Sequence, residues 1–302
     1  MSKICTLREA VAGIEDGAAV AMGCGLESLI PFAAGYEIMR QKKRDLTLIA
    51  PISDIQFDQL IGAGRAKKII AAWVGNVAAG LGHNFRRAME EGIPRPLEVE
   101  EHSNFTIALA LQAAGMGLSY LPTRTALGSD FTSAPHFKAI ACPFTGEKLL
   151  AVRAVAPDVA ILHVQRADSE GNAHLWGNLG VTREAANAAK RVILTCEEVV
   201  DHEVILSDPN RTLIPGILVS HVVHAPFGSH PSPTQGYARR DDNFYFDYHR
   251  QSRRLEGFQE WLRKWVFGAG GHEGYLELLG KERREKLTPG MDLFSPPVNF
   301  SV

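Results

Sequence analysis

Two glycines near the start of the chain could bring backbone N–H groups against a ligand. Gly23 and Gly25 follow the apolar run 20–22 and precede a helical pattern that has Pro31 in its first turn. Because glycine has no Cβ, both residues can adopt positive φ and let N–H groups line an anionic or thioester group. The dinucleotide-binding fingerprint is not met, since its third glycine and its acidic ribose ligand are missing. A tight turn without ligand contact is the alternative.

An arginine in an apolar, glycine-containing segment is the second candidate for binding chemistry. Arg124 lies within 121–130, and its guanidinium could hold a carboxylate through two parallel hydrogen bonds, which a lysine does less well. The alternative is a salt bridge to one of the acidic residues that precede it, Glu98, Glu100 and Glu101.

Three further polar residues stand where predicted elements begin or end. Ser103 and Asn104 open the helical pattern 104–116, where they could contact a substrate or act as plain N-caps. Asn76 follows an apolar run, and its amide could donate to a carbonyl or satisfy a turn.

The histidines and cysteines do not predict a metal site. His221 and His224 are three apart on an expected strand, which places them on opposite faces. His230 lies in a loop at a strand end, where substrate contact and a structural role both remain open. Cys24 has no neighbouring base to activate it as a nucleophile.

The elements that would position these residues alternate between strands and helices. Continuous apolar runs indicate strands that are covered on both faces, at 20–22, 46–49, 69–74, 159–164, 192–195 and 217–223. Helical patterns lie between them, around 29–42, 55–63, 84–91, 104–116 and 183–190. This order predicts an α/β fold with a mostly parallel sheet wrapped by helices. We expect residues 1–246 to form this body. Residues 247–302 should be a helical appendage with aromatic anchors, packed on the same domain, whose tail from 289 lies on a neighbour.

The composition of the chain argues against several classes of protein function. The chain has 302 residues with 32 basic and 34 acidic side chains, so its charge does not favour binding to nucleic acid or to an anionic membrane. No apolar run approaches the ~20 residues that span a bilayer. The first residues lead into a capped helix instead of a signal peptide, and four scattered cysteines suit a reducing compartment. We therefore expect a cytoplasmic protein.

Taken in order, the segments resemble the alpha (A) subunit of family I coenzyme A-transferases, most closely the glutaconate coenzyme A-transferases. The resemblance begins with DGAAVAMGCG at 16–25 and Pro31. It continues through 45–49, 60–68, 158–163, the turn 168–172, 195–198, 214–216, VHAPFGSHPS at 223–232 and EWLRKWVF at 260–267.

The resemblance implies covalent catalysis on a coenzyme A thioester, with no bound cofactor. In this family a glutamate attacks the acyl-CoA, and its glutamyl-CoA thioester then passes CoA to a second carboxylic acid. In two-subunit members that glutamate belongs to the beta subunit, so this chain would supply half of an active site to a homologous partner, in an α2β2 or larger assembly. Glu170, in Ser-Glu-Gly-Asn, is not assigned as the nucleophile, and the catalytic residue of this chain is unknown.

On this hypothesis Gly23 and Gly25 form a loop that faces the active-site cleft. The carboxylate and acyl pocket is shaped by Asn76, Ser103, Asn104, Arg124 and Ser129. One segment departs from the pattern: 121–129 is more similar to the alpha subunit of the steroid ring-cleaving hydrolases, whose glutamate falls at Asn104. A CoA-ester hydrolase, a decarboxylase and a non-catalytic scaffolding protein therefore remain alternatives to the CoA-transferase.

Overall fold

A seven-stranded parallel arrangement forms the centre of the molecule. The computed structural model describes residues 2–290. Its main sheet has the order β14-β12-β10-β1-β2-β3-β6, with all neighbouring pairs parallel. The strands are β1 Ala19–Met22, β2 Leu46–Ile52, β3 Ala66–Trp73, β6 Glu98–Glu101, β10 Val159–Ala167, β12 Val192–Val199 and β14 Val219–His224. Two short strands extend the sheet beyond β10: β11 Ala173–His174 pairs antiparallel with β10, and β13 Thr212–Ile214 pairs antiparallel with β11. The predicted fold class is confirmed.

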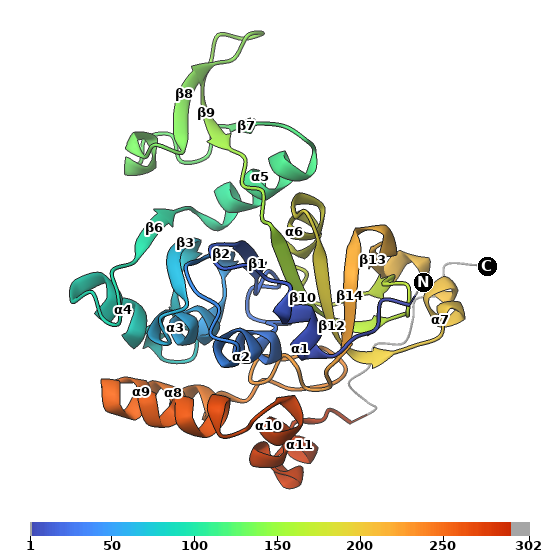
Figure 1. Cartoon of the computed structure of the whole chain (residues 1–302). Helices are drawn as coiled ribbons and strands as arrows, with labels where there is room; N and C mark the ends of the chain where they lie inside the picture. The colour runs from blue at the N-terminus through green and yellow to red at the C-terminus, as the bar shows by residue number, and fades with distance from the viewer. Residues whose placement is uncertain (1, 291–302) are drawn as a thin grey trace.

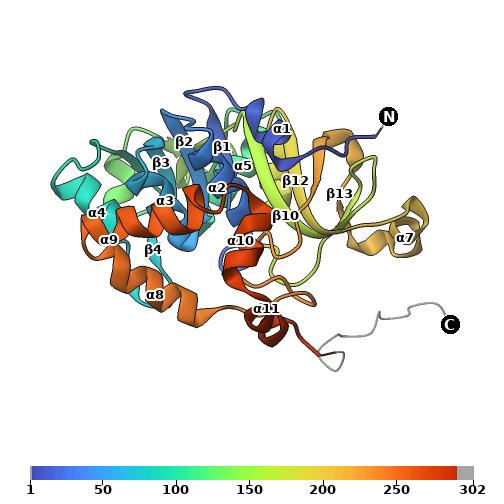
Figure 2. The same ribbon diagram turned by 60° about the horizontal axis from the view of Figure 1, so that its bottom comes forward.

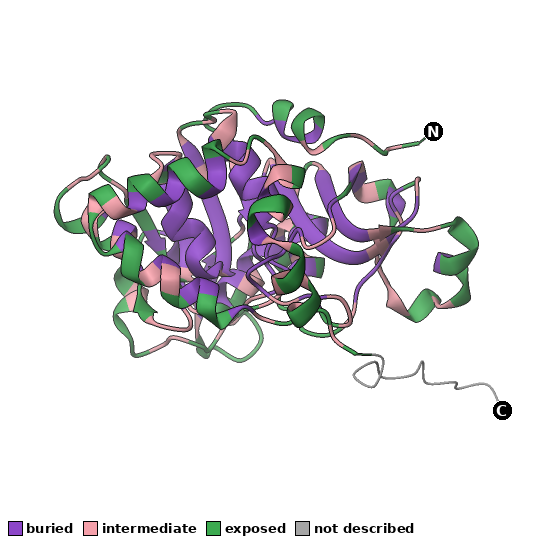
Figure 3. Ribbon diagram, turned by 90° about the horizontal axis from the view of Figure 1, so that it is seen from below, coloured by how far each residue is buried: buried purple, intermediate pink, exposed green. Residues whose placement is uncertain are grey.

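Helices cover both faces of this sheet (Figure 1). Along β1, Val20 and Met22 belong to one core cluster and Ala21 to the other, as the strand period of two requires. The first cluster includes buried residues of α1 Leu7–Ala12, α2 Phe32–Arg40, α3 Asp54–Gly62 and α4 His83–Glu90; the second includes those of α5 Asn104–Gly115 and α6 Thr182–Ala188. The central strands are buried, and the outward faces of the surrounding helices are exposed (Figure 3).

The C-terminal helices pack on the α2–α4 side of the body (Figure 2). They are α8 Asp242–Ser252, α9 Leu255–Leu262, a π-helical turn at Arg263–Phe267, α10 His272–Leu279 and α11 Lys281–Leu287. Trp261 is 1% exposed and contacts Tyr36 of α2 at a centroid distance of 5.9 Å, so the expected aromatic anchor is present there. Phe267, one of the aromatic residues of 247–302 expected to be anchors, is not an anchor, because its side chain is 46% exposed. The expected tail, 289–302, lies almost wholly outside the described residues.

A small antiparallel sheet stands away from the body and was not predicted (Figure 1). Its order is β7-β9-β8, from β7 Tyr120–Thr123, β8 Phe137–Ala141 and β9 Lys148–Arg153. It follows α5, and a 3₁₀ turn at Asp130–Ser133 connects β7 to β8. The remaining elements are the hairpin β4 Gly75–Asn76 with β5 Gly80–Leu81, the helix α7 His202–Ser207, and 3₁₀ turns at Pro209–Arg211 and Gly216–Leu218. No helix among residues 2–290 is long and apolar enough to cross a membrane.

Candidate functional site

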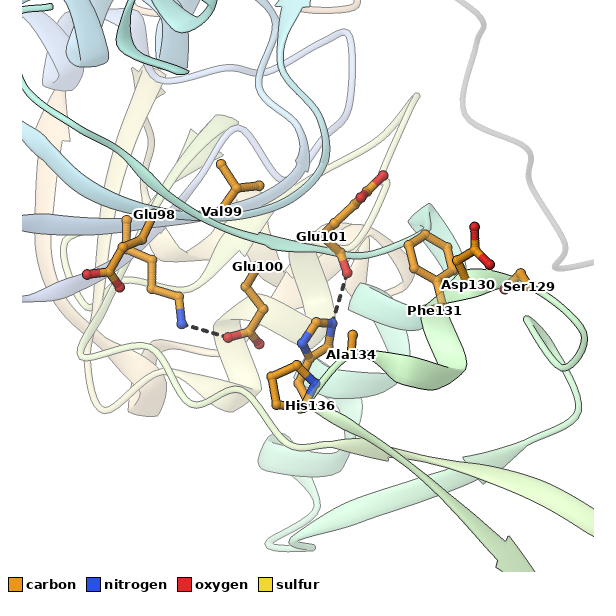
Figure 4. Close-up of a pocket in the computed structure, with 11 residues that line it drawn as sticks. Glu98, Val99, Glu100, Glu101, Ser129, Asp130, Phe131, Ala134 and His136 are labelled. Atoms are coloured by element: carbon orange, nitrogen blue, oxygen red, sulfur yellow. Dashed lines mark hydrogen bonds and ion pairs between the residues drawn. The ribbon is translucent and has the colours of Figure 1, made fainter. Parts of the chain in front are cut away.

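A cleft of about 750 Å³ opens along β6, the edge strand of the main sheet (Figure 4). One wall is β6 with Lys68 of β3, and the other is the chain between β7 and β8. The lining side chains are Lys68, Glu98, Val99, Glu100, Glu101, Ser129, Asp130, Phe131, Ala134, Pro135 and His136. The cleft therefore lies between the parallel sheet and the small antiparallel sheet.

The charge of this cleft is negative. Four carboxylates line it against a single lysine, which leaves three net negative charges when His136 is neutral. Burial lowers the pKa of His136, and the nearby imidazole of His102 and guanidinium of Arg153 oppose its protonation further. A cleft of this sign favours cations over a free carboxylate.

Glu100 is the most buried carboxylate of the cleft, at 7% exposure. Lys68 Nζ donates to its Oε2 at 2.6 Å, and Arg153 Nη2 donates to the same oxygen at 3.0 Å. Burial opposes ionisation of this carboxyl, yet the hydrogen bonds from His102 and Lys68 and the charges of Lys68 and Arg153 hold its pKa well below the ordinary value. Glu100 is therefore ionised at neutral pH.

Two histidines lie beside this carboxylate. His102 directly follows β6, and its Nε2 is 3.5 Å from Glu100 Oε1. His136 directly precedes β8, and its Nε2 donates to the backbone oxygen of Glu101 at 2.9 Å (Figure 4). The two rings are in contact, at a centroid distance of 4.7 Å and an interplanar angle of 31°. Sequence reasoning did not bring these residues together, because His136 is 35 residues from Glu101 and no local spacing pattern links them.

The glycine loop, residues 23–25, is buried within the body and does not line the cleft. Gly23 has the expected positive φ, 78°, but Gly25 does not; there a Cβ would instead collide with the carbonyl oxygen of Ser28. Val181 N donates to the oxygen of Cys24 at 2.8 Å, which covers the loop with a segment of the same body. Burial raises the pKa of the Cys24 thiol to about 12, so this thiol is not a thiolate at neutral pH.

Asn76 is also buried, and its side chain forms hydrogen bonds with backbone groups. Its Nδ2 donates to the oxygen of Tyr245 at 2.9 Å, and its Oδ1 accepts from Ala78 N and Ala79 N at 3.0 and 3.1 Å. These bonds close the turn between β4 and β5 and tie it to α8. Asn76 thus has both roles that the sequence left open, a turn and donation to a carbonyl, while its predicted place in a substrate pocket stays a prediction.

Ser103 and Asn104 follow the end of β6 and begin α5. Ser103 is the N-cap: its Oγ accepts from Thr106 N, and Thr106 Oγ1 accepts from Ser103 N. Asn104 is exposed at the first position of the helix. Ser103 therefore caps α5, whereas the side chain of Asn104 is accessible to solvent.

Arg124 and Ser129 lie on the chain that follows β7. Ser129 lines the cleft and donates its Oγ hydrogen to the oxygen of Ala126 at 2.7 Å. Arg124 is 70% exposed and its Nη2 donates to both carboxylate oxygens of Glu147, each at 2.6 Å. The partner is a glutamate of the β8–β9 hairpin, not one of the three that precede Arg124.

His230 belongs to the interior. Its Nε2 shares a hydrogen bond with Asp241 Oδ2 at 2.9 Å, and Arg283 of α11 donates to the same carboxylate. At 1% exposure the His230 ring joins the 226–232 loop to the C-terminal helices. This resolves the open question about His230 in favour of a structural role.

Comparison with known proteins places this geometry in a family. The family model described as "Coenzyme A transferase" matches residues 4–225. The chain is 45% identical to the A subunit of 3-oxoadipate CoA-transferase from Pseudomonas knackmussii, over 89% of this chain and 95% of that protein. It is 35% identical to the A subunit of glutaconate CoA-transferase from Acidaminococcus fermentans, over 96% of this chain and 97% of that protein.

The fold agrees with these matches. The crystal structure of glutaconate coenzyme A-transferase from Acidaminococcus fermentans superposes with a TM-score of 0.91 and covers 97% of both chains. A weaker likeness, 26% identity over 88% of this chain and 94% of the other, is to the cholesterol ring-cleaving hydrolase IpdA subunit of Mycobacterium tuberculosis. Both resemblances seen in the sequence are confirmed. The chain belongs to the coenzyme A transferase family.

Proposed function

We propose that this chain is the alpha subunit of a two-subunit enzyme that moves coenzyme A from an acyl-CoA thioester to a carboxylic acid. The observation that carries the proposal is its 45% identity, over nearly the whole length of both chains, to a protein named as the A subunit of 3-oxoadipate CoA-transferase. The 0.91 TM-score to a glutaconate coenzyme A-transferase supports the same activity.

A glutamate of a homologous beta subunit is the nucleophile in this proposal. Its carboxylate attacks the thioester carbonyl, which forms a mixed anhydride and releases CoA as a thiolate. The thiolate then attacks the glutamyl carbonyl, giving an enzyme thioester and the free carboxylate of the first substrate. The second acid reverses both steps. No cofactor is required, and the acyl-CoA is a substrate.

The hydrogen bonds that the carboxylates of this chain accept support the proposal that the nucleophile belongs to another chain. Among residues 2–290, each buried carboxylate accepts hydrogen bonds from this chain's own groups: Glu37, Asp54, Asp58, Glu100, Asp168, Glu197 and Asp241. Glu170 is exposed in the turn that follows β10. A carboxylate held by two cations, like Glu100, is a poor nucleophile because attack would break those ion pairs.

We further propose a dicarboxylic acid as the substrate, with one carboxylate bound by Arg124. The relatives at 45% and 35% identity are named for 3-oxoadipate and glutaconate, and both acids carry two carboxylates. The floor of the cleft repels such a group, whereas Arg124 is exposed and already holds a carboxylate, with its Nη2 in contact with both oxygens of Glu147. Asn104 and Ser129, which are exposed, are candidates to contact the acyl group, and Gly23, Gly25 and Asn76 act as internal supports.

A CoA-ester hydrolase is the second candidate, and the 26% identity to a ring-cleaving hydrolase subunit favours it. In that case water replaces the acceptor acid. The two activities differ in a directly observable way, because only the transferase needs a second carboxylic acid to complete its turnover.

The test is intact-mass spectrometry of this chain co-expressed with the product of its neighbouring gene. The pair is incubated with succinyl-CoA, acetyl-CoA and glutaryl-CoA in turn, and then with 3-oxoadipate or glutaconate. A CoA-sized adduct on the partner that a free acid discharges is the expected result. Consumption of acyl-CoA without adduct or acceptor would establish the hydrolase, and no turnover with any pairing would contradict both activities.

A further inference from the structure

We propose that Glu100, His102 and His136 bind one divalent transition-metal ion, of the zinc class, at the floor of the cleft. Each of the three residues offers one ligand atom, and these atoms all lie within 4.8 Å of one another. All three side chains are buried, with exposures of 7%, 2% and 6%. Two imidazoles and one carboxylate are a common donor set for such ions.

The oxygen partners of the two rings allow each histidine to offer one nitrogen lone pair to an ion. His136 Nε2 donates to the oxygen of Glu101, which leaves the lone pair on Nδ1. His102 Nδ1 lies 3.2 Å from Thr106 Oγ1, and its Nε2 lies 3.5 Å from Glu100 Oε1. An ion would select the tautomer that donates from Nδ1 to Thr106, in place of the one that donates from Nε2 to Glu100, because only the first leaves a lone pair on Nε2. A metal-bound histidine characteristically donates its other ring hydrogen to an oxygen in this way.

The charges beside Glu100 oppose a cation in part. Lys68 donates to Oε2, and Arg153 Nη2 lies within 3.1 Å of both oxygens. A carboxylate has about four lone-pair positions, so Oε1 can still accept a metal on the side of His102. The lining carboxylates outnumber the two cations by two, so the cleft remains negative with both cations counted. Neither histidine adds positive charge when it is neutral and bound to a metal.

The present separations describe a site that is open before binding. Zinc–nitrogen bonds of about 2.0–2.1 Å give a tetrahedral edge of roughly 3.3–3.4 Å, so no pair of ligand atoms needs to approach by more than about 1.5 Å. His136 lies on the chain that enters β8, and Glu100 and His102 lie at the end of β6. The ion would therefore join the edge of the parallel sheet to the small antiparallel sheet. A fourth coordination position would face the cleft.

The experiment measures metal binding without any turnover assay, so its outcome is independent of the proposed activity. The full chain, with its partner subunit where one co-purifies, is treated with a chelator and titrated with zinc chloride by calorimetry. We expect one high-affinity ion per chain. Because loss of an outer partner alone weakens metal binding about 10- to 100-fold, His102→Gln and His136→Gln should each weaken it at least about tenfold. His221→Gln, a change in a half-buried histidine of β14, is the matched control and should bind as the wild type does.

X-ray absorption by the zinc-loaded wild type decides the ligand set even if a variant fails to fold. We expect two imidazole nitrogens with oxygen completing the shell. Absence of a one-to-one site, a spectrum with fewer than two imidazoles or with sulfur, or wild-type zinc affinity in folded His102→Gln and His136→Gln would each overturn the proposal.

Discussion

Replacement of Arg124 separates a role in substrate binding from a role in folding. The guanidinium is 70% exposed, and its carboxylate partner Glu147 is 49% exposed. An ion pair this accessible to water contributes about 0–1 kcal/mol to stability. Arg124→Lys and Arg124→Gln should therefore change the free energy of unfolding by less than about 1 kcal/mol, as measured by urea denaturation of the purified complex.

The effect on turnover should be larger if Arg124 holds a substrate carboxylate. A hydrogen bond to a charged group contributes roughly 1.5–3 kcal/mol, which corresponds to about 10- to 150-fold in kcat/KM. Arg124→Gln loses the whole interaction and should approach the upper value. Arg124→Lys keeps the charge but loses the two-point geometry, so its loss should be nearer tenfold, for the dicarboxylic acid.

Glu147→Gln is the matched control, because Glu147 occupies the same guanidinium that the substrate would bind. Removal of this competing charge should leave KM for the acid unchanged or lower it. The assay is the steady-state rate of CoA transfer with the acid varied. If Arg124→Lys lowers stability while kcat/KM for the acid stays at the wild-type value, the proposed role of Arg124 is wrong.

Two further substitutions and one labelling experiment test other parts of the structure. Gly23→Ala should destabilise the protein by about 2 kcal/mol or more, measured by urea denaturation, because φ is 78° and the new Cβ would collide with Ser53. Arg283→Gln should cost about 2 kcal/mol at pH 7, because it removes two charge-assisted hydrogen bonds from buried Asp241. Burial raises the pKa of Asp241, but the bonds from His230 and Arg283 lower it by more, so its net pKa is below the ordinary value. The stabilisation that Arg283 gives through Asp241 should therefore be complete above pH ~4 and decrease as the pH falls toward the lowered pKa. A stability difference between wild type and Arg283→Gln that grows in acid would contradict this reasoning. Cys24 should resist alkylation in the native protein and react only after unfolding, as peptide mass mapping would show, since its pKa is about 12.

The strands of the parallel sheet could be predicted because they are apolar throughout. Residues covered on both faces leave a continuous pattern, and the runs at 46–49 and 159–164 lie within β2 and β10. β6 escaped this rule because three of its four residues are glutamates. It is the edge strand, and one side of it is open to the cleft. Its residues therefore include charged side chains that contact solvent, and it lacks the apolar pattern of the core strands.

The small sheet β7-β9-β8 could not be predicted for a related reason. β7 and β8 are largely exposed or half-buried, and β7 contains Pro122, which weakens a strand pattern. The sequence singles out Arg124 by its residue type and Ser129 through the family resemblance, but their sequence context does not show that they lie beside this sheet. The cluster of Glu100, His102 and His136 depends on the return of the chain from β7 to β8, and such a contact leaves no local signal.

The exposure of the proposed binding residues has a consequence for how the enzyme must work. Asn104, Arg124 and Ser129 are exposed in this chain, and a carboxylate bound by an arginine in open water gains little. The same contact strengthens when a second protein surface excludes water from it. The proposed beta subunit would therefore do two things at once: it would bring the nucleophilic glutamate and it would strengthen the contacts that this chain already presents. On this reasoning the isolated chain should bind the dicarboxylic acid too weakly for calorimetry to detect, whereas the complex should bind it measurably. Equal binding by the isolated chain and the complex would show that the site is complete within this chain.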